Sequence, residues 1–125
     1  MRPGAHSFDL LSTTTEEIPT FYTCPAEAID YWDGKGIVSH MRDVLSNYPT
    51  PWIWHLDAQG FGLKHALEMG VAMDLLAFFR NDEFGKSLDH VIIVNANHYL
   101  RGMFAILKPF LTLEEKPLIE KISFQ

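Results

Sequence analysis

The segment VIIVNANHYLRGMFAILKPFL, residues 91–111, decides the fold because it joins two different hydrophobic patterns. Its first half belongs to the run His90–Asn95. Apolar residues follow one another there without alternation, which is typical of a strand in the middle of a parallel sheet. In its second half, Tyr99–Leu111, apolar side chains fall on one arc of about 160°, which predicts an amphipathic helix. A buried strand followed directly by such a helix indicates an α/β protein.

The same alternation of strands and helices extends along the chain on both sides of this segment. Short β-branched and aromatic runs predict further strands at Phe21–Cys24, Trp52–Asp57 and Lys121–Phe124. Helical spacing predicts helices at Ile37–Tyr48 and Leu63–Arg80, a capping box predicts a short one from Thr112, and Asn81–Asp89 is a polar loop. Strands that alternate with helices pair in parallel through right-handed crossovers, so we expect an α/β sandwich with a small, mostly parallel sheet of about four strands.

The N-terminal region differs from the rest of the chain in its pattern. Residues 1–18 include the polar run STTTEE and show no hydrophobic periodicity, so we expect them to form a flexible N-terminal arm. A chain of 125 residues is close to the commonest domain size. Residues 19–125 are therefore predicted to form one domain.

Composition excludes several classes of protein. Acidic side chains outnumber basic ones by 16 to 10, and the resulting net charge of −6 argues against nucleic-acid binding and against stable adsorption on an anionic membrane. The single cysteine, Cys24, excludes an internal disulfide and a cysteine-based metal cage. No signal peptide and no apolar run of about 18 residues occurs, so we expect a soluble, cytoplasmic protein.

The helix predicted for Leu63–Arg80 has an unusual second half. From Val71 to Phe79 its apolar side chains surround the helix axis, and only Asp74 interrupts them. A helix that covers a sheet normally keeps one polar face, so we expect this part to be buried on two sides. Such a helix is either ordinary core or part of the wall of an apolar site.

Four short motifs follow one another along the second half of the chain. They are Asp57-Ala58-Gln59-Gly60, Ile93-Val94-Asn95-Ala96-Asn97, Lys108-Pro109-Phe110-Leu111 and Lys121-Ile122. In order and spacing they resemble the lipid-binding domain of the Sec14-like family, also called CRAL-TRIO. The resemblance covers residues 56–124. It implies a short version of that domain, without the N-terminal helical module and the C-terminal closing segment of the family.

The resemblance implies non-catalytic binding, transfer or sensing of a lipid or another apolar ligand, with transient membrane contact and no cofactor. Residues 99–111 would form the movable gate helix of the family, with hinges at Asn97 and at Pro109, where a proline kinks or ends the helix. Positions on helix and strand faces then suggest a ligand lining of Trp54, Met73, Leu76, Phe79, Tyr99, Met103, Phe104, Leu107 and Phe110. Arg101 and Lys108 are the candidates for a lipid head group, and the alternative for both is a solvated helix face. A homodimer is also expected, because an uncovered apolar surface is a liability on a monomer.

A second interpretation is a STAS-like protein-interaction or scaffold module, which would bury its apolar face by dimerisation. STAS domains are smaller strand-helix sandwiches that act through partners. Their Asp-Ser-Ser-Gly-like phosphorylation loop does not occur in this sequence.

Enzymatic activity is a third interpretation, and the residues favour it least. His55 and Asp57 share one face of a strand, but the sequence contains neither a zinc motif such as HExxH nor a glycine-rich phosphate loop. His65 and Glu68, three residues apart on a helix, are interpreted as a hydrogen-bonded pair on the surface. We therefore predict no catalytic residue and no metal site.

Overall fold

The computed structural model describes residues 7–12, 18–28, 31–108 and 120–125, and it confirms the predicted α/β class. Its five strands lie in the order β1-β2-β3-β4-β5, with β1 antiparallel to β2 and all other neighbours parallel. The strands are β1 (Asp9–Ser12), β2 (Thr20–Thr23), β3 (Trp52–Asp57), β4 (Leu88–Val94) and β5 (Ile122–Phe124). The sheet has one strand more than expected, and this additional strand is β1.

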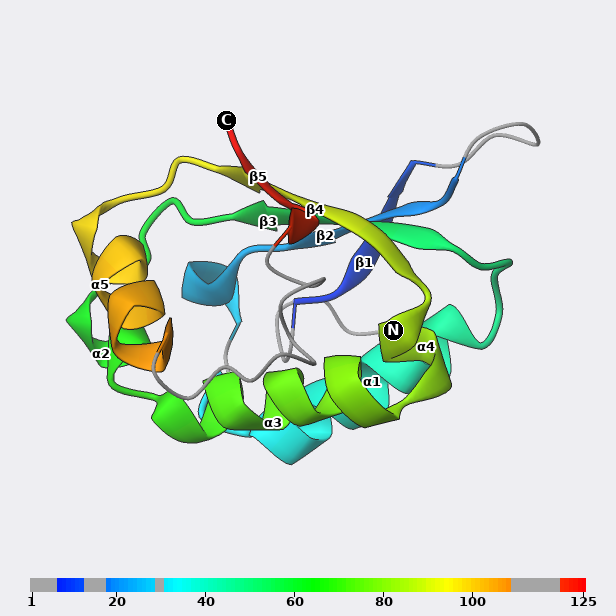
Figure 1. Cartoon of the computed structure of the whole chain (residues 1–125), viewed down its shortest axis with the longest axis horizontal. Coiled ribbons are helices and arrows are strands. Elements are labelled where there is room, and N and C mark those ends of the chain that lie inside the picture. Colours follow the sequence, from blue (N-terminus) through cyan, green and yellow to red (C-terminus); the bar gives the residue numbers. More distant parts are fainter. Residues whose placement is uncertain (1–6, 13–17, 29–30, 109–119) are drawn as a thin grey trace.

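The described helices lie on one side of the sheet (Figure 1). They are the 3-10 helix η1 (Pro25–Glu27) and the α-helices α1 (Gly34–Leu45), α2 (Leu63–Ala66), α3 (Met69–Asn81), α4 (Glu83–Lys86) and α5 (His98–Leu107). The parallel strands β2 to β5 follow one another across the sheet in the order of the sequence. When each connection between such strands is a right-handed crossover, all crossover helices lie on the same face of the sheet. The molecule is therefore a two-layer structure in which α1 and α3 lie side by side beneath the strands (Figure 1).

The strand register decides which side chains meet the helices. Trp54 of β3 is paired with Phe21 of β2 and with Val91 of β4, so these side chains share one face of the sheet. All three are buried. Ile53 and Ile92, which alternate with them along β3 and β4, lie on the opposite face and are only half-buried.

Trp52 is the centre of the aromatic core. It is fully buried, and its indole Nε1 donates a 2.6 Å hydrogen bond to the carbonyl oxygen of Phe84. The rings of Phe8 and Phe21 meet the Trp52 ring edge-on, with centroids 5.7 and 6.0 Å away. Because the indole N–H finds an acceptor, so large a side chain can be buried without leaving a donor unpaired.

The prediction of a flexible arm over residues 1–18 is wrong for residues 7–12. Asp9–Ser12 forms β1, which pairs with β2, and Phe8 is buried with its ring stacked on Phe21 at a centroid distance of 5.0 Å. The physical reason is tertiary, because one aromatic side chain and strand pairing order a segment that has no periodicity of its own. Pairing also covers one edge of the otherwise parallel sheet.

The helix predicted for Leu63–Arg80 is two helices, α2 and α3. The chain leaves helical geometry at Glu68, whose ψ of 65° makes it the residue preceding α3. Hydrophobic spacing continues across this break, so periodicity alone could not detect it. The prediction of a polar loop at Asn81–Asp89 is also wrong, because residues 83–86 form α4 and β4 begins at Leu88.

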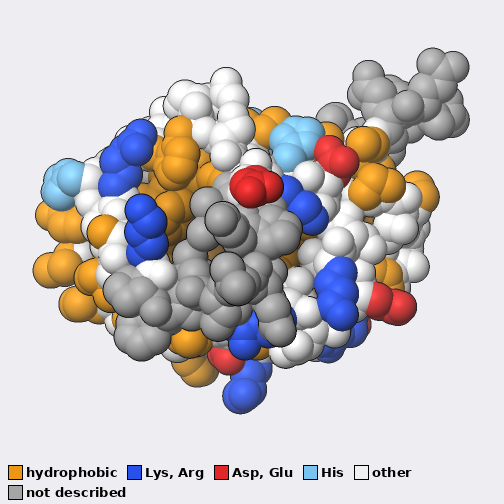
Figure 2. Space-filling view, viewed as in Figure 1, with side chains coloured by type: hydrophobic (Ala, Val, Ile, Leu, Met, Phe, Trp, Pro, Cys, Tyr) orange, Lys and Arg blue, Asp and Glu red, His pale blue; other side chains and the backbone are white. Residues whose placement is uncertain are grey.

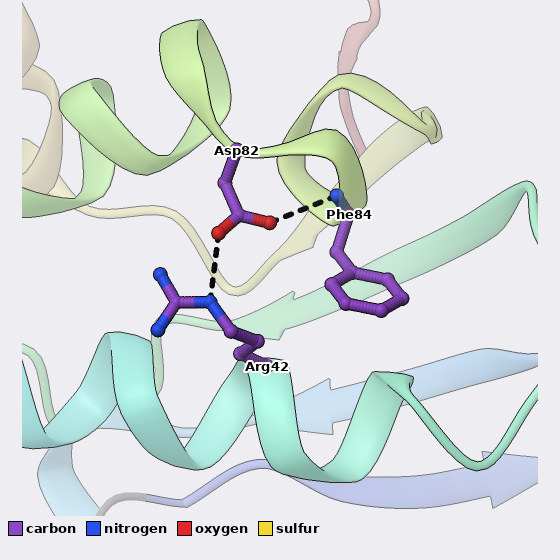
Figure 3. Close-up of polar contacts among 3 residues, drawn as sticks. All are labelled: Arg42, Asp82 and Phe84. Carbon is purple, nitrogen blue, oxygen red and sulfur yellow. Dashed lines mark hydrogen bonds and ion pairs between the residues drawn. The ribbon is translucent and has the colours of Figure 1, made fainter.

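Helix α4 is held by a polar contact at its start (Figure 3). The Asp82 carboxylate accepts hydrogen bonds from the backbone N–H of Phe84 (2.9 Å) and from Nε of Arg42 on α1 (2.7 Å). An exposed ion pair contributes little stability, about 0–1 kcal/mol. Its effect is to fix the position of α4 against α1. Gly85 then allows close approach to α3, because a Cβ atom there would collide with the Phe78 carbonyl.

Helix α3 is covered on two sides, by the sheet and by α1, as its apolar pattern predicts. Its Val71 and Phe78 are buried. The Asp74 side chain packs so closely on Gly34 of α1 that a Cβ atom at position 34 would collide with it. However, Met73 is 44% exposed, so α3 also keeps a solvent-facing side that the pattern did not predict. The helix expected from Thr112 lies outside the described residues.

The buried position of Phe8 gives a direct test of the N-terminal correction. Phe8→Ala should lower the free energy of unfolding by about 3–5 kcal/mol, because it removes an aromatic side chain from the core. Leu11→Ala, at an exposed position of the adjacent strand, should change it by less than about 0.5 kcal/mol. Urea denaturation of both variants measures the difference, and equal small effects would show that residues 7–12 do not belong to the fold.

Candidate functional site

An apolar cavity of about 140 Å³ lies between the sheet and the helices. Its floor is formed by strands β2 to β5, and its walls are formed by α1, α3 and α5 together with η1, the segment before β1 and the loops before α1 and after β3. The side chains from the sheet are Thr23, Trp54, Leu56, Val91, Ile93 and Ile122. Those from α1, α3 and α5 are Ile37, Met41, Val71, Ala72, Leu75, Leu76, Phe79, Leu100, Met103, Phe104 and Leu107. The others are Ser7 and Phe8 before β1, Pro25 of η1, Tyr31 before α1 and Phe61 after β3.

The polar atoms of this lining are few and uncharged. Thr23 Oγ1 accepts a hydrogen bond from Trp54 Nε1 (2.8 Å), and Ser7 Oγ accepts one from the Cys24 backbone N–H (2.9 Å). Burial, and secondarily the negative charge of Glu68, raises the pKa of Tyr31 to about 12, so its hydroxyl stays neutral. Among the described residues that line the cavity there is no Asp, Glu, Lys, Arg or His. The site is therefore suited to a neutral apolar group.

The size of the cavity limits what it can hold. A dry cavity of about 150 Å³ lined by Leu, Ile and Phe is known to bind benzene or xenon. Pockets for drug-sized ligands are larger, at about 300–1,000 Å³. A cavity of about 140 Å³ therefore accommodates a ring or a short branched chain, but not a complete lipid.

Six of the predicted lining residues do line the cavity, namely Trp54, Leu76, Phe79, Met103, Phe104 and Leu107. Met73 and Tyr99 do not, because they lie on the outer sides of α3 and α5 with exposures of 44% and 38%. The side of α5 that faces the cavity consists of Leu100, Met103, Phe104 and Leu107. This side begins one residue after Tyr99, so Tyr99 points away from the cavity. Phe110 lies outside the described residues.

The head-group candidates lie on the surface and not at the cavity. Arg101 and Lys108 are both exposed on or next to α5, and neither contributes to the lining. The Arg101 guanidinium lies 4.7 Å from the centroid of the Phe124 ring, which is a cation–π contact with β5. Their position fits the alternative of a solvated helix face.

Asn97 fixes the start of α5. Its Oδ1 accepts hydrogen bonds from the backbone N–H groups of Tyr99 and Leu100, both at 3.1 Å, and so caps the helix. Its Nδ2 donates to the carbonyl oxygens of Phe61 (3.0 Å) and Ala58 (3.4 Å) in the loop after β3. Helix α5 is thus tied to that loop at the residue predicted as a hinge. The other predicted hinge, Pro109, lies outside the described residues.

His65 is a cavity neighbour that the sequence did not reveal. The predicted surface pair with Glu68 is wrong, because His65 is only 5% exposed and its Nδ1 accepts a 2.9 Å hydrogen bond from the Gly62 backbone N–H. The ring lies beside Tyr31 and Phe61, with both centroids 5.3 Å away. Burial, and then the positive charge of Lys64, lowers the pKa of His65. The helical spacing of residues 63–68 contained no signal for this packing.

A polar network lies at the carboxyl ends of the strands, away from the cavity. The Asp57 carboxylate accepts hydrogen bonds from the Tyr22 hydroxyl (2.9 Å), Asn95 Nδ2 (2.9 Å) and the Gln59 backbone N–H (3.0 Å). Burial alone would raise the pKa of Asp57, but these hydrogen bonds outweigh it and hold the pKa below its usual value. Asp57 therefore joins β2, β3 and β4 as a structural group. No cluster of potential metal ligands occurs within residues 7–12, 18–28, 31–108 and 120–125.

Exposed apolar side chains gather where α2 and α5 pack together at one end of the molecule. On α2 and its flank, Leu63 and Leu67 are 58% and 69% exposed, and on α5 Tyr99 and Ile106 are also exposed. Lys64 is exposed on α2, and Arg101 and Lys108 are exposed on another side of α5, where Arg101 packs on Phe124 of β5. Figure 2 shows hydrophobic side chains at this end with Lys and Arg side chains beside them. We refer to the seven residues on and next to α2 and α5 as the end surface. No helix of the described chain is long and apolar enough to cross a bilayer.

Comparison with known proteins adds no assignment to this geometry. The sequence matches no protein-family model, and no curated protein matches it significantly. The resemblance to Sec14-like domains therefore rests on the four sequence motifs alone. What the chain can bind has to be argued from the cavity and the surface.

Proposed function

We propose that this chain binds a small apolar ligand, such as part of a lipid, non-covalently in the cavity between sheet and helices, as a minimal Sec14-like domain would. The observation that supports this most directly is a preformed cavity of about 140 Å³ whose described lining residues are uncharged and almost wholly apolar. Protein interiors are normally packed without voids of this size. An unfilled cavity costs stability, which a ligand that fills it would restore.

The proposal includes no chemical reaction. A catalytic site needs an acid, a base or a nucleophile that reaches the bound molecule. In the described lining the candidates are the hydroxyls of Ser7, Thr23 and Tyr31. The His65 ring lies beside Tyr31, but its Nδ1 already accepts a hydrogen bond from the Gly62 backbone N–H. Ser7 and Thr23 are already hydrogen-bonded within the protein. Binding, transfer or sensing is therefore the function that we propose.

The expected affinity follows from the size of the site. Burying six CH₂-sized groups gains about 5 kcal/mol, at roughly 0.8 kcal/mol for each group. Loss of translational and rotational freedom offsets part of this gain. A ring-sized ligand alone should therefore bind with a dissociation constant of about 1 mM, which corresponds to about −4 kcal/mol.

Benzene is a suitable probe for this cavity. At about five times its dissociation constant it should raise the free energy of unfolding by about 1 kcal/mol, since it binds only the folded state. The Tm, measured by differential scanning calorimetry, should then rise by about 4 °C. Native mass spectrometry and lipid extraction of the purified protein would show whether a natural ligand is already bound.

A matched pair of variants on α3 controls this experiment. Ala72 lines the cavity, whereas Ala77 is exposed on another side of the same helix. Ala72→Leu should fill the cavity and abolish the benzene-induced rise in Tm, and Ala77→Leu should leave it unchanged. If benzene stabilises neither the wild-type protein nor Ala77→Leu, and no apolar molecule is extracted, the proposed function is wrong.

We also propose that the end surface brings the protein into transient contact with an anionic membrane, where apolar ligands are found. Its leucines protrude as apolar anchors with Lys64 on the same helix, and Arg101 and Lys108 add positive charge on another side of α5. Each Lys or Arg near an anionic bilayer contributes about 1 kcal/mol. The net charge of −6 opposes adsorption elsewhere on the molecule, so the contact should be weak and reversible.

Flotation with vesicles tests the membrane proposal. The protein should bind vesicles of phosphatidylcholine and phosphatidylserine, and bind pure phosphatidylcholine less, because the end surface is basic. Leu67→Glu should weaken binding at least about tenfold, since inserting one leucine gains about 1.5–3 kcal/mol. Leu11→Glu, at an exposed position on β1, should bind like the wild type. Equal binding by both variants would contradict a role for the end surface.

A STAS-like interaction module that dimerises is the second candidate, and one observation favours it. In the described structure all helices lie on one side of the sheet, which leaves Ile53 and Ile92 half-buried on the other side (Figure 1). A second copy covering this face would account for the expected homodimer. Sedimentation equilibrium should then give a dimer that Ile92→Asp dissociates. A wild-type monomer at micromolar concentration would contradict this candidate.

A further inference from the structure

His65 can accept the hydrogen bond at the start of α2 only in its neutral form. The Gly62 backbone N–H donates to Nδ1 over 2.9 Å, and this contact, together with the backbone bonds of the first turn, begins the helix. An N–H group is only a donor, so Nδ1 must be unprotonated and the ring proton must be on Nε2. When the ring takes up a second proton, Nδ1 becomes a donor and the two N–H groups oppose each other. Protonation therefore removes this contact.

The His65 ring also supports one wall of the cavity. It packs between Tyr31, which it meets edge to face, and Phe61, with both ring centroids 5.3 Å away. Both of these aromatic side chains line the cavity. Helix α2 in turn packs against α5, which supplies four more lining side chains. Displacement of His65 would therefore remove support from Tyr31, Phe61 and one side of α5 together.

The surroundings of His65 offer a positive charge little compensation. Lys64 on the same helix repels it, and Tyr31 on the segment before α1 is neutral. Asp33 on that segment accepts a hydrogen bond from the Gly36 backbone N–H at the start of α1. Glu68 lies beyond the end of α2, and its charge acts on Tyr31. The charged or titratable side chains near this end on α5 are His98, Arg101 and the adjoining Lys108, all of them exposed and none of them acidic. No carboxylate contact with His65 occurs in the described structure.

We propose that protonation of His65 opens the Tyr31–Phe61 wall of the cavity, so that acidification releases the bound apolar ligand. This inference rests on the proposed function, because it assigns a regulation to the same site. In the closed form neutral His65 is buried against the Tyr31–Phe61 wall, and the open form exposes the imidazole to water, where its charged form is stable. Proton uptake thus favours the open form.

The direction of the pH dependence follows from the difference in the pKa of His65 between the closed and the open form. In the closed protein burial and Lys64 lower the pKa of His65 from its ordinary value of 6.5. In the open or unfolded chain the pKa of His65 is about 6.5. The closed form is therefore fully favoured above that pH, and it loses stability as the pH falls below it. Because one proton is involved, ligand affinity should fall by up to about tenfold for each pH unit in this window.

The test measures benzene binding to the full chain by calorimetry and ligand-observed NMR at pH 7.5 and pH 5.5. Wild-type affinity should fall several-fold, and up to about tenfold, at the lower pH. In His65→Asn the side-chain amide oxygen takes the place of Nδ1 as an acceptor that does not titrate, so affinity should change by less than about twofold. His98→Asn, at an exposed histidine on α5, should keep the wild-type pH dependence.

The outcomes distinguish failure of this inference from failure of the proposed function. Absence of benzene binding at pH 7.5, together with no apolar molecule extracted from the purified protein, would overturn the proposed function and this inference with it. Equal binding at both pH values, or a pH dependence that His65→Asn retains, would overturn this inference alone.

A measurement on the wild-type protein covers the case in which His65→Asn does not fold. Protonation of His65, followed by the NMR shifts of its ring, should coincide with faster hydrogen exchange of the Gly62 amide, because that amide loses its acceptor. Continued protection of the Gly62 amide after the ring has titrated would contradict the proposal.

Discussion

The rest of the structure depends on one topological constraint, which is that strands β2 to β5 are parallel and adjacent in the order of the sequence. Each connection must cross from the end of one strand to the start of the next, and right-handed crossovers in one direction place every helix on the same face. Figure 1 shows the result, with α1 and α3 beneath the strands and α5 at one end. The cavity lies where this single helical layer does not close completely on the apolar floor of the sheet.

The cavity and the end surface are linked through α5 and the short helix α2. Leu100 and Met103 on one side of α5 line the cavity, while Tyr99 and Ile106 on another side are exposed at the end surface. Helix α2 divides its residues in the same way, with His65 buried beside the cavity wall and Leu63 exposed to solvent. Two amphipathic elements therefore connect the interior with the surface that we propose for membrane contact.

The elements that the sequence predicted correctly are those whose pattern is local. Strands β3 and β4 follow from continuous β-branched and aromatic runs, and α5 follows from the helical spacing of its apolar residues. Strand β1 and the packing of His65 could not be predicted, because each depends on residues far away in the chain, namely Phe21 for Phe8 and Tyr31 for His65. Met73 was assigned to the lining because α3 is apolar nearly all round, so its sequence does not mark the side that faces the cavity.

The central claim is that the space between sheet and helices is a dry apolar site. A crystal structure determined under xenon pressure tests this claim most directly, because xenon occupies such cavities without needing any polar contact. We predict a xenon atom between Trp54 of the sheet and Leu76 of α3, with no ordered water in the space around it. A cavity that takes up no xenon, or that contains ordered water hydrogen-bonded to the protein, would contradict the account.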